Sequence, residues 1–148
     1  SRDFLMNLPI YIVSLKRDIE RRNKINDVFH RLNINFDFFD AIDAKDPQNK
    51  EIIDKMRLSG VGAEMTDGEI ACTLSHQLIY KDMIDKNIEW AVILEDDVIV
   101  NEKFKKFLQY FNLSEKDKLK HNNLICLEDK KDYMIIRYWG KAFLVKLR

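Results

Sequence analysis

The chain has 148 residues, of which 46% are hydrophobic and 34% charged, so its length and composition are those of one compact domain and exclude a disordered protein. Lysine and arginine together number 25, and aspartate and glutamate also number 25, a balance that excludes a general electrostatic attraction to nucleic acid. Because no apolar run is as long as a membrane-spanning helix and the N-terminus lacks a signal-peptide pattern, we expect a single cytoplasmic domain over residues 1–148.

The first predicted unit is a β-α-β unit. Residues 9–15 (PIYIVSL) are apolar and β-branched, which is typical of a short buried strand. In residues 18–34 the apolar positions recur every three to four residues, which predicts an amphipathic helix with Asp18 as its N-cap. Residues 35–43 (NFDFFDAID) predict a second strand, and the two strands of such a unit pair in parallel.

The middle of the chain predicts a loop and then a long helix. Residues 44–65 are polar, which indicates a loop around a short helix. Thr66 and Glu69 have the spacing of a capping box for a helix over residues 66–87, which Asn87 can end. The apolar face expected for this helix consists of Ile70, Leu74, Leu78, Met83 and Ile84.

The remaining elements complete a mixed α/β pattern. An apolar strand over residues 91–94 precedes a helix over residues 101–112, for which Asn101 is the expected cap. Residues 123–128 predict a short buried strand, and residues 133–147 predict two strands with a turn near Gly140. The expected buried positions of the 101–112 helix are Phe104, Phe107, Leu108 and Phe111.

The two cysteines, Cys72 and Cys126, are predicted to be reduced core residues. They lie far apart in apolar segments, and the sequence has no C-x-x-C motif and no spaced cysteine and histidine set. The sequence pattern therefore predicts neither a disulfide framework nor a cysteine metal site.

Three consecutive acids, Glu95, Asp96 and Asp97, follow the strand in AVILEDDVIV (residues 91–100). Sites in open α/β sheets form at the carboxyl ends of the parallel strands. Two acids one residue apart project to the same side, so Glu95 and Asp97 can share Mg²⁺ or Mn²⁺ that bridges a diphosphate, while Asp96 points elsewhere. The alternative is that one acid caps the following turn and the others are solvated, and the triplet by itself leaves both open.

Three blocks in this order resemble the signature blocks of glycosyltransferase family 25, the lipooligosaccharide galactosyltransferase family. They are residues 9–25 (PIYIVSLKRDIERRNKI), 67–76 (DGEIACTLSH) and 91–100, and the resemblance continues weakly through WGKAFLVK. It implies a GT-A-like, nucleotide-sugar-binding three-layer α/β/α domain with a mixed, mainly parallel sheet. The implied activity is an inverting transfer of a hexose, galactose from UDP-galactose, to a lipooligosaccharide acceptor, with Mn²⁺ or Mg²⁺. The implied location is the inner face of the bacterial inner membrane, with at most peripheral membrane association.

The resemblance also implies roles for the acid triplet and for the first block. Glu95 and Asp97 would face the metal and the donor diphosphate, and Asp96 would lie near the donor ribose or sugar. The other implied donor contacts are Ile12, Ser14 and Leu15 for uracil and ribose, and Arg17 and Arg21 for phosphate. The alternative for both arginines is a solvated helix face on which they pair with Glu20.

The second block implies donor or acceptor contacts from Glu69, Ser75 and His76. Glu69 has a sufficient structural role in the capping box, and His76 also fits a satisfied helix histidine. This block departs from the usual family form, which has glycine where this chain has Ala71. An apolar helix face explains Cys72 better than a site does.

The catalytic assignment is incomplete. Besides Asp97, an inverting transfer needs a carboxylate that takes the acceptor hydroxyl proton. Glu128, with Asp129, is a weak candidate for this base at the end of the 123–128 strand, and a solvated loop is the alternative. Because family members are longer, we expect the acceptor-binding part to be missing.

Two rival functions are a truncated, non-catalytic nucleotide-sugar-binding module and a haloacid-dehalogenase-like phosphatase. The phosphatase requires Glu95 as nucleophile, whose extra methylene misplaces the attacking oxygen.

Overall fold

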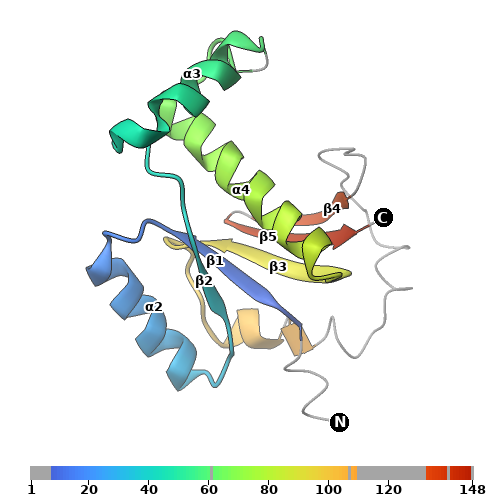
Figure 1. Cartoon of the computed structure of the whole chain (residues 1–148). Coiled ribbons are helices and arrows are strands. Elements are labelled where there is room, and N and C mark those ends of the chain that lie inside the picture. The colour runs from blue at the N-terminus through green and yellow to red at the C-terminus, as the bar shows by residue number, and fades with distance from the viewer. Residues whose placement is uncertain (1–7, 61, 107, 110–132, 140, 148) are drawn as a thin grey trace.

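The computed structural model describes residues 8–60, 62–106, 108–109, 133–139 and 141–147. They form a five-stranded sheet in the order β2-β1-β3-β5-β4, with α2 on one face and α4 on the other (Figure 1). The expected three-layer α/β/α fold is thereby confirmed. Alternate side chains of β1 point to opposite faces of the sheet: Ile10 and Ile12 pack toward α2, whereas Tyr11 and Val13 pack toward α4.

The predicted β-α-β unit is confirmed. β1 (Ile10–Ser14) is buried throughout, and β2 (Asp37–Asp40) pairs with it in parallel. The Asp18 side chain caps α2 (Ile19–Arg31) by accepting a hydrogen bond from the Arg21 backbone N–H. The cap supplies an acceptor for a backbone donor that has no partner within the helix.

The capping box of α4 (Asp67–Asp85) is also confirmed, since Thr66 and Glu69 exchange backbone-to-side-chain hydrogen bonds of 3.1 Å each. The predicted apolar face is only partly correct. Leu78 and Ile84 are each 42% exposed, because at 100° per residue they lie beside the stripe that packs on the sheet. The buried residues of α4 are Ile70, Ala71, Leu74, Ser75, Ile79, Tyr80 and Met83.

The segment between β2 and α4 contains a 3-10 turn, η1 (Pro47–Asn49), and the helix α3 (Lys50–Leu58). Ile53 of α3 is buried against Ile70 and Leu74 of α4, so α3 packs on the first half of α4. The predicted loop around a short helix is therefore confirmed. Among the residues that the structure describes, no helix is both long and apolar enough to cross a membrane.

β3 (Trp90–Glu95) lies at the centre of the sheet. It pairs in parallel with β1 and antiparallel with β5 (Ala142–Leu147), which pairs antiparallel with β4 (Tyr133–Trp139). Of the four described strand pairings, two are parallel and two are antiparallel, so the sheet is mixed, as expected.

The helix predicted after β3 is described in part. Residues 102–106 are helical, and the Asn101 side chain caps them by accepting from the Phe104 N–H at 3.2 Å. Phe104 and Leu108 are buried on the α2 side of the sheet. The predictions for Phe107, Phe111 and the 123–128 strand fall outside the described residues.

Candidate functional site

The acid triplet lies where β1 and β3 end side by side. Val13 of β1 is paired with Glu95, the last residue of β3. The chain turns directly afterwards, and the Val98 N–H donates to the Glu95 carbonyl at 3.1 Å. Asp96 and Asp97 therefore lie in a turn at the carboxyl ends of two parallel strands, the usual position for a binding site in an open α/β sheet.

The carboxylates of Glu95 and Asp97 both form an ion pair with the same lysine, Lys141. The Lys141 ammonium lies 3.3 Å from Glu95 Oε2 and 3.4 Å from Asp97 Oδ2. Its hydrogen bond to Glu95 and the charges of both acids raise the Lys141 pKa. The two carboxylates thus lie on one side of the turn and create a position that suits a cation.

Lys141 is a site residue that the sequence analysis missed. It directly precedes β5, and its carbonyl accepts from the Glu95 N–H at 2.9 Å. Its nearness to the acids depends on the pairing of β5 with β3. Since strand pairing across a long sequence separation is not readable from local patterns, no signal in the sequence indicates this lysine.

Asp96 points to the other side of the turn. Its Oδ2 accepts from the Ser14 hydroxyl at 2.8 Å, and its Oδ1 accepts from Arg21 at 3.0 Å. The Asp96 side chain is only 13% exposed. Because both of its oxygens have partners on β1 and α2, Asp96 links three elements around the site.

A cleft of about 390 Å³ opens at these strand ends. Its walls come from the ends of β1 and β3, the segment after β2 and the first half of α4. It brings together many of the predicted residues: Ser14, Leu15, Arg17, Arg21, Ser75, Glu95, Asp96 and Asp97. Ile12 does not line it, because its side chain is fully buried and its backbone lies between β2 and β3.

Arg17 and Arg21 pair with acids other than the predicted Glu20. Arg17 Nε donates to Asp43 at 2.6 Å at the rim of the cleft, and this hydrogen bond lowers the Asp43 pKa. Glu20 instead pairs with Lys24, with 3.9 Å between Glu20 Oε1 and Lys24 Nζ. The predicted pairing with Glu20 is therefore wrong for both arginines, whose side chains are 56% and 49% exposed.

Arg22, which the sequence analysis did not single out, contacts the last residues of β1 and β2. It donates to the Ser14 carbonyl at 2.7 Å and to the Asp40 carboxylate at 2.8 Å. It thereby joins the ends of β1 and β2.

The second block has mainly structural contacts. The Ser75 hydroxyl lines the cleft but accepts from the Ile42 N–H at 2.9 Å and donates to the Ala71 carbonyl at 2.7 Å. Glu69 lies outside the cleft lining and closes the capping box. The His76 ring packs edge-on against Phe143, with ring centroids 5.1 Å apart. These contacts position α4 against the segment after β2 and against β5.

The prediction that Cys72 is a core residue is wrong. Cys72 is exposed in the cleft, and its Sγ lies 3.5 Å from Glu95 Oε1. Desolvation of the sulfur and the Glu95 charge raise the Cys72 pKa to about 11. The ligand atoms of Cys72, His76 and Glu95 lie within 4.8 Å of one another. The i,i+4 spacing of Cys72 and His76 was the available sequence signal, because such residues share a helix face.

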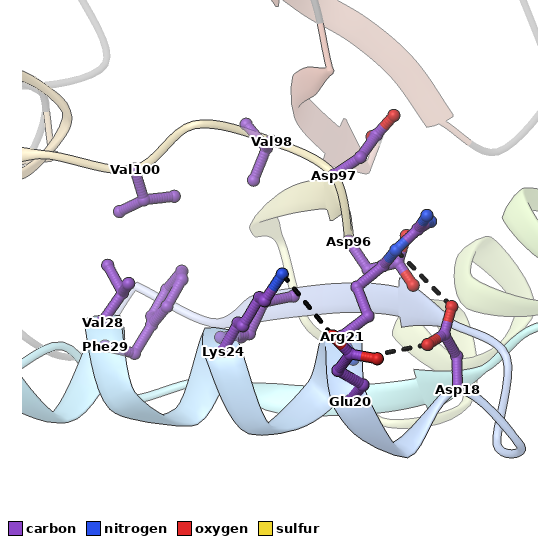
Figure 2. A pocket seen from close by; sticks show the side chains of 11 residues that line it. Asp18, Glu20, Arg21, Lys24, Val28, Phe29, Asp96, Asp97, Val98 and Val100 are labelled. Carbon is purple, nitrogen blue, oxygen red and sulfur yellow. Dashed lines mark hydrogen bonds and ion pairs between the residues drawn. The ribbon is translucent and has the colours of Figure 1, made fainter.

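A second cleft, of about 450 Å³, lies between α2 and the segment after β3. Figure 2 shows it with Lys24, Val28 and Phe29 from α2 facing Val98 and Val100. Arg21, Asp96 and Asp97 line both clefts, so the Arg21–Asp96 pair forms part of the wall between them. The sequence analysis did not predict this cleft, because no local motif encodes the path of the chain after β3.

Glu128 and Asp129, the predicted candidates for a base, lie outside the described residues.

Comparison with known proteins gives a consistent family. The model of glycosyltransferase family 25 (LPS biosynthesis protein) matches residues 7–139. The lipooligosaccharide biosynthesis protein lic2B of Haemophilus influenzae is 30% identical over 141 residues, which cover 90% of this chain and 53% of that protein. The chain therefore spans about half the length of this relative.

Other similar proteins come from bacteria and animals. The lacto-N-neotetraose biosynthesis glycosyltransferase LgtB of Neisseria meningitidis serogroup B is 31% identical, over 66% of this chain and 36% of that protein. Human procollagen galactosyltransferase 2 is 31% identical, over 67% of this chain and 17% of that protein.

Proposed function

Because the chain belongs to glycosyltransferase family 25, we propose that it is the donor-binding part of an enzyme that transfers a hexose from a nucleotide sugar to a saccharide. The proposed donor is UDP-galactose and the proposed acceptor a lipooligosaccharide. Relatives named for lipooligosaccharide biosynthesis and for galactosyl transfer support this choice. Because such an acceptor is linked to lipid, we propose that the protein acts at the cytoplasmic face of the bacterial inner membrane, with which it associates peripherally.

One observation carries the proposal: Glu95 and Asp97 share a single cation position in a cleft at the carboxyl ends of β1 and β3. The Lys141 ammonium that lies between them is a stand-in for a metal ion, so the residues present fit one. We assign Glu95 and Asp97 as the protein ligands of Mn²⁺ or Mg²⁺, whose hard oxygen preference they satisfy. When bound, such an ion neutralises charge on the diphosphate leaving group.

The rest of the cleft suggests how the donor is held. Leu15 and the end of β1 offer a surface for the uracil and ribose, beside Asp96. Arg17 is 56% exposed at the rim, so its guanidinium can reach a phosphate by giving up its pair with Asp43. Lys141 is 53% exposed and is free to meet the diphosphate once a metal ion takes its place.

We propose that the transfer inverts the anomeric centre, which requires a carboxylate to accept the proton of the acceptor hydroxyl. Glu128 stays the candidate for this base. Asp97 is assigned to the donor side, because its carboxylate faces the cation position together with Glu95.

The metal assignment is tested by titrating the chain with Mn²⁺ in the presence of UDP. Binding is measured as the loss of the electron paramagnetic resonance signal of the free ion. Asp97→Asn is expected to weaken binding at least about tenfold, because one of two charged ligands is lost. Asp54→Asn is the matched control, since Asp54 pairs with Lys50 on α3. Equal affinity in the Asp97→Asn variant and the control would remove Asp97 from the metal site.

The rival functions predict different behaviour. A non-catalytic module would bind UDP with metal in the same cleft but release no UDP from UDP-galactose when acceptor is added. A haloacid-dehalogenase-like phosphatase would need Glu95 as nucleophile, yet the matching family is one of glycosyltransferases. The transferase is therefore the function that the site supports best.

A further inference from the structure

A second set of ligand-type side chains lies close together at the cleft, two of them among its lining residues. Cys72 and His76 are one helical turn apart on α4, and Glu95 ends β3, which α4 crosses (Figure 1). The thiol sulfur, an imidazole nitrogen and a carboxylate oxygen from these residues lie within 4.8 Å of one another. Two packed elements of the fold thus present three different metal-ligand groups to one point.

We propose that Cys72, His76 and Glu95 form a binding site for a borderline-soft divalent transition ion, of which Zn²⁺ is the best match. Asp97 is not a member of this group. Glu95 is common to both proposed sites, but Cys72 and His76 are not ligands of the donor metal, so the proposal goes beyond that site.

The distances suit such an ion. Tetrahedral zinc with ordinary bond lengths holds a thiolate sulfur and a carboxylate oxygen roughly 3.5 Å apart. Cys72 Sγ and Glu95 Oε1 are already 3.5 Å apart. The remaining separations, up to 4.8 Å, require only a small rotation of the side chains.

Neighbouring groups hold two of the ligands in place. Glu95 presents Oε1 to Cys72 while its Oε2 is paired with Lys141 at 3.3 Å. The His76 ring packs edge-on against Phe143 and Tyr80, with centroid distances of 5.1 and 6.3 Å. These contacts restrict the orientation of both side chains.

The ligand chemistry separates this site from the Glu95–Asp97 pair. Thiolate, imidazole and carboxylate together select zinc and similar ions, whereas Mg²⁺ and Mn²⁺ prefer oxygen ligands alone. As the sulfur–metal bond forms, the Cys72 thiol gives its proton to the solvent. Cys72 and Glu95 line the open cleft, so an ion has an entry path and keeps a fourth position for water or another ligand.

The test is a titration of the reduced chain with Co²⁺, which reports a thiolate ligand through an ultraviolet charge-transfer band and tetrahedral geometry through visible bands. One ion per chain is expected, displaced by Zn²⁺. Cys72→Ser is expected to abolish the charge-transfer band, and His76→Gln to weaken Co²⁺ binding at least about tenfold. Cys126→Ser is the matched control for the other thiol and is expected to keep the band. Circular dichroism checks that each variant is folded.

Three results would overturn the assignment: no charge-transfer band in the unaltered chain, the same band in Cys72→Ser, or unchanged affinity in His76→Gln, which would indicate a lone thiol. Asp97→Asn separates the two metal proposals. It is expected to weaken Mn²⁺ binding at least about tenfold and to retain the cobalt band. Loss of the cobalt band in this variant would contradict the three-residue site.

Discussion

At the scale of single residues, neighbouring acids have different surroundings. Asp97 and Glu95 face a cation, while Asp96 is tied to Ser14 and Arg21. The sequence analysis predicted this division from the alternation of side chains along an extended chain, although Asp96 and Asp97 lie in a turn that follows β3. Lys141 and the exposure of Cys72 were not predictable, because each depends on which elements pack beside the end of β3.

Asp96→Asn is expected to lower the free energy of unfolding by about 1–2 kcal/mol. The substitution keeps an acceptor for Ser14 but removes the charge that pairs with Arg21. A hydrogen bond to a charged group contributes about 1.5–3 kcal/mol, and the half-exposed position of Arg21 reduces this contribution. Urea unfolding of Asp96→Asn and of Asp97→Asn provides the comparison. A loss no larger than that of the 47% exposed Asp97 would show that Asp96 does not link the elements.

Arg17→Ala is expected to weaken binding of UDP more than binding of uridine, because the guanidinium at the cleft rim is assigned to phosphate. Calorimetric titrations of the two ligands measure the difference. Lys24→Ala is the control, since Lys24 lines the second cleft and not the first. Equal losses for UDP and uridine would show that Arg17 does not touch phosphate.

At the scale of elements, the helices were the most predictable parts of the chain. Asp18 and the Thr66–Glu69 capping box mark the starts of two helices, through hydrogen bonds between residues that are close in sequence. The buried face of α4 was less predictable, as Leu78 and Ile84 show, because which apolar residues are covered depends on how the helix lies on the sheet.

Thr66→Ala is expected to destabilise the chain by about 1 kcal/mol, because the first turn of α4 loses the acceptor for the Glu69 N–H. Chemical denaturation measures the change. Thr73→Ala is the control, since the Thr73 hydroxyl bonds to the Glu69 carbonyl within the helix and caps no end. Equal stability of Thr66→Ala and the unaltered chain would remove the capping-box account.

Lys141→Met is expected to tighten Mn²⁺ binding in the absence of donor by about three- to tenfold, since the ammonium competes through two partly exposed ion pairs. The element responsible is β5, whose start brings Lys141 to the end of β3. Lys81→Met is the control, because Lys81 pairs with Asp85 on the exposed side of α4. Weaker Mn²⁺ binding in Lys141→Met would indicate that the lysine supports the metal site.

At the scale of the whole molecule, the α/β/α arrangement explains where the site lies. The parallel strands β1 and β3 end together, and α4 closes one side of the resulting cleft. The β-α-β unit and the acid-bearing strand were readable from periodicity and turn residues. The antiparallel pairing of β5 with β3 was not readable in this way, because strand order is set by contacts between residues distant in sequence.

The most direct test of the account is a calorimetric titration of UDP-galactose into the chain, once with Mn²⁺ and once with EDTA. The account predicts saturable binding with Mn²⁺ and its loss in EDTA, because Glu95 and Asp97 meet the diphosphate through a shared cation. Binding of equal affinity in EDTA, or no binding by a chain that circular dichroism shows to be folded, would contradict a metal-dependent donor site at the ends of β1 and β3.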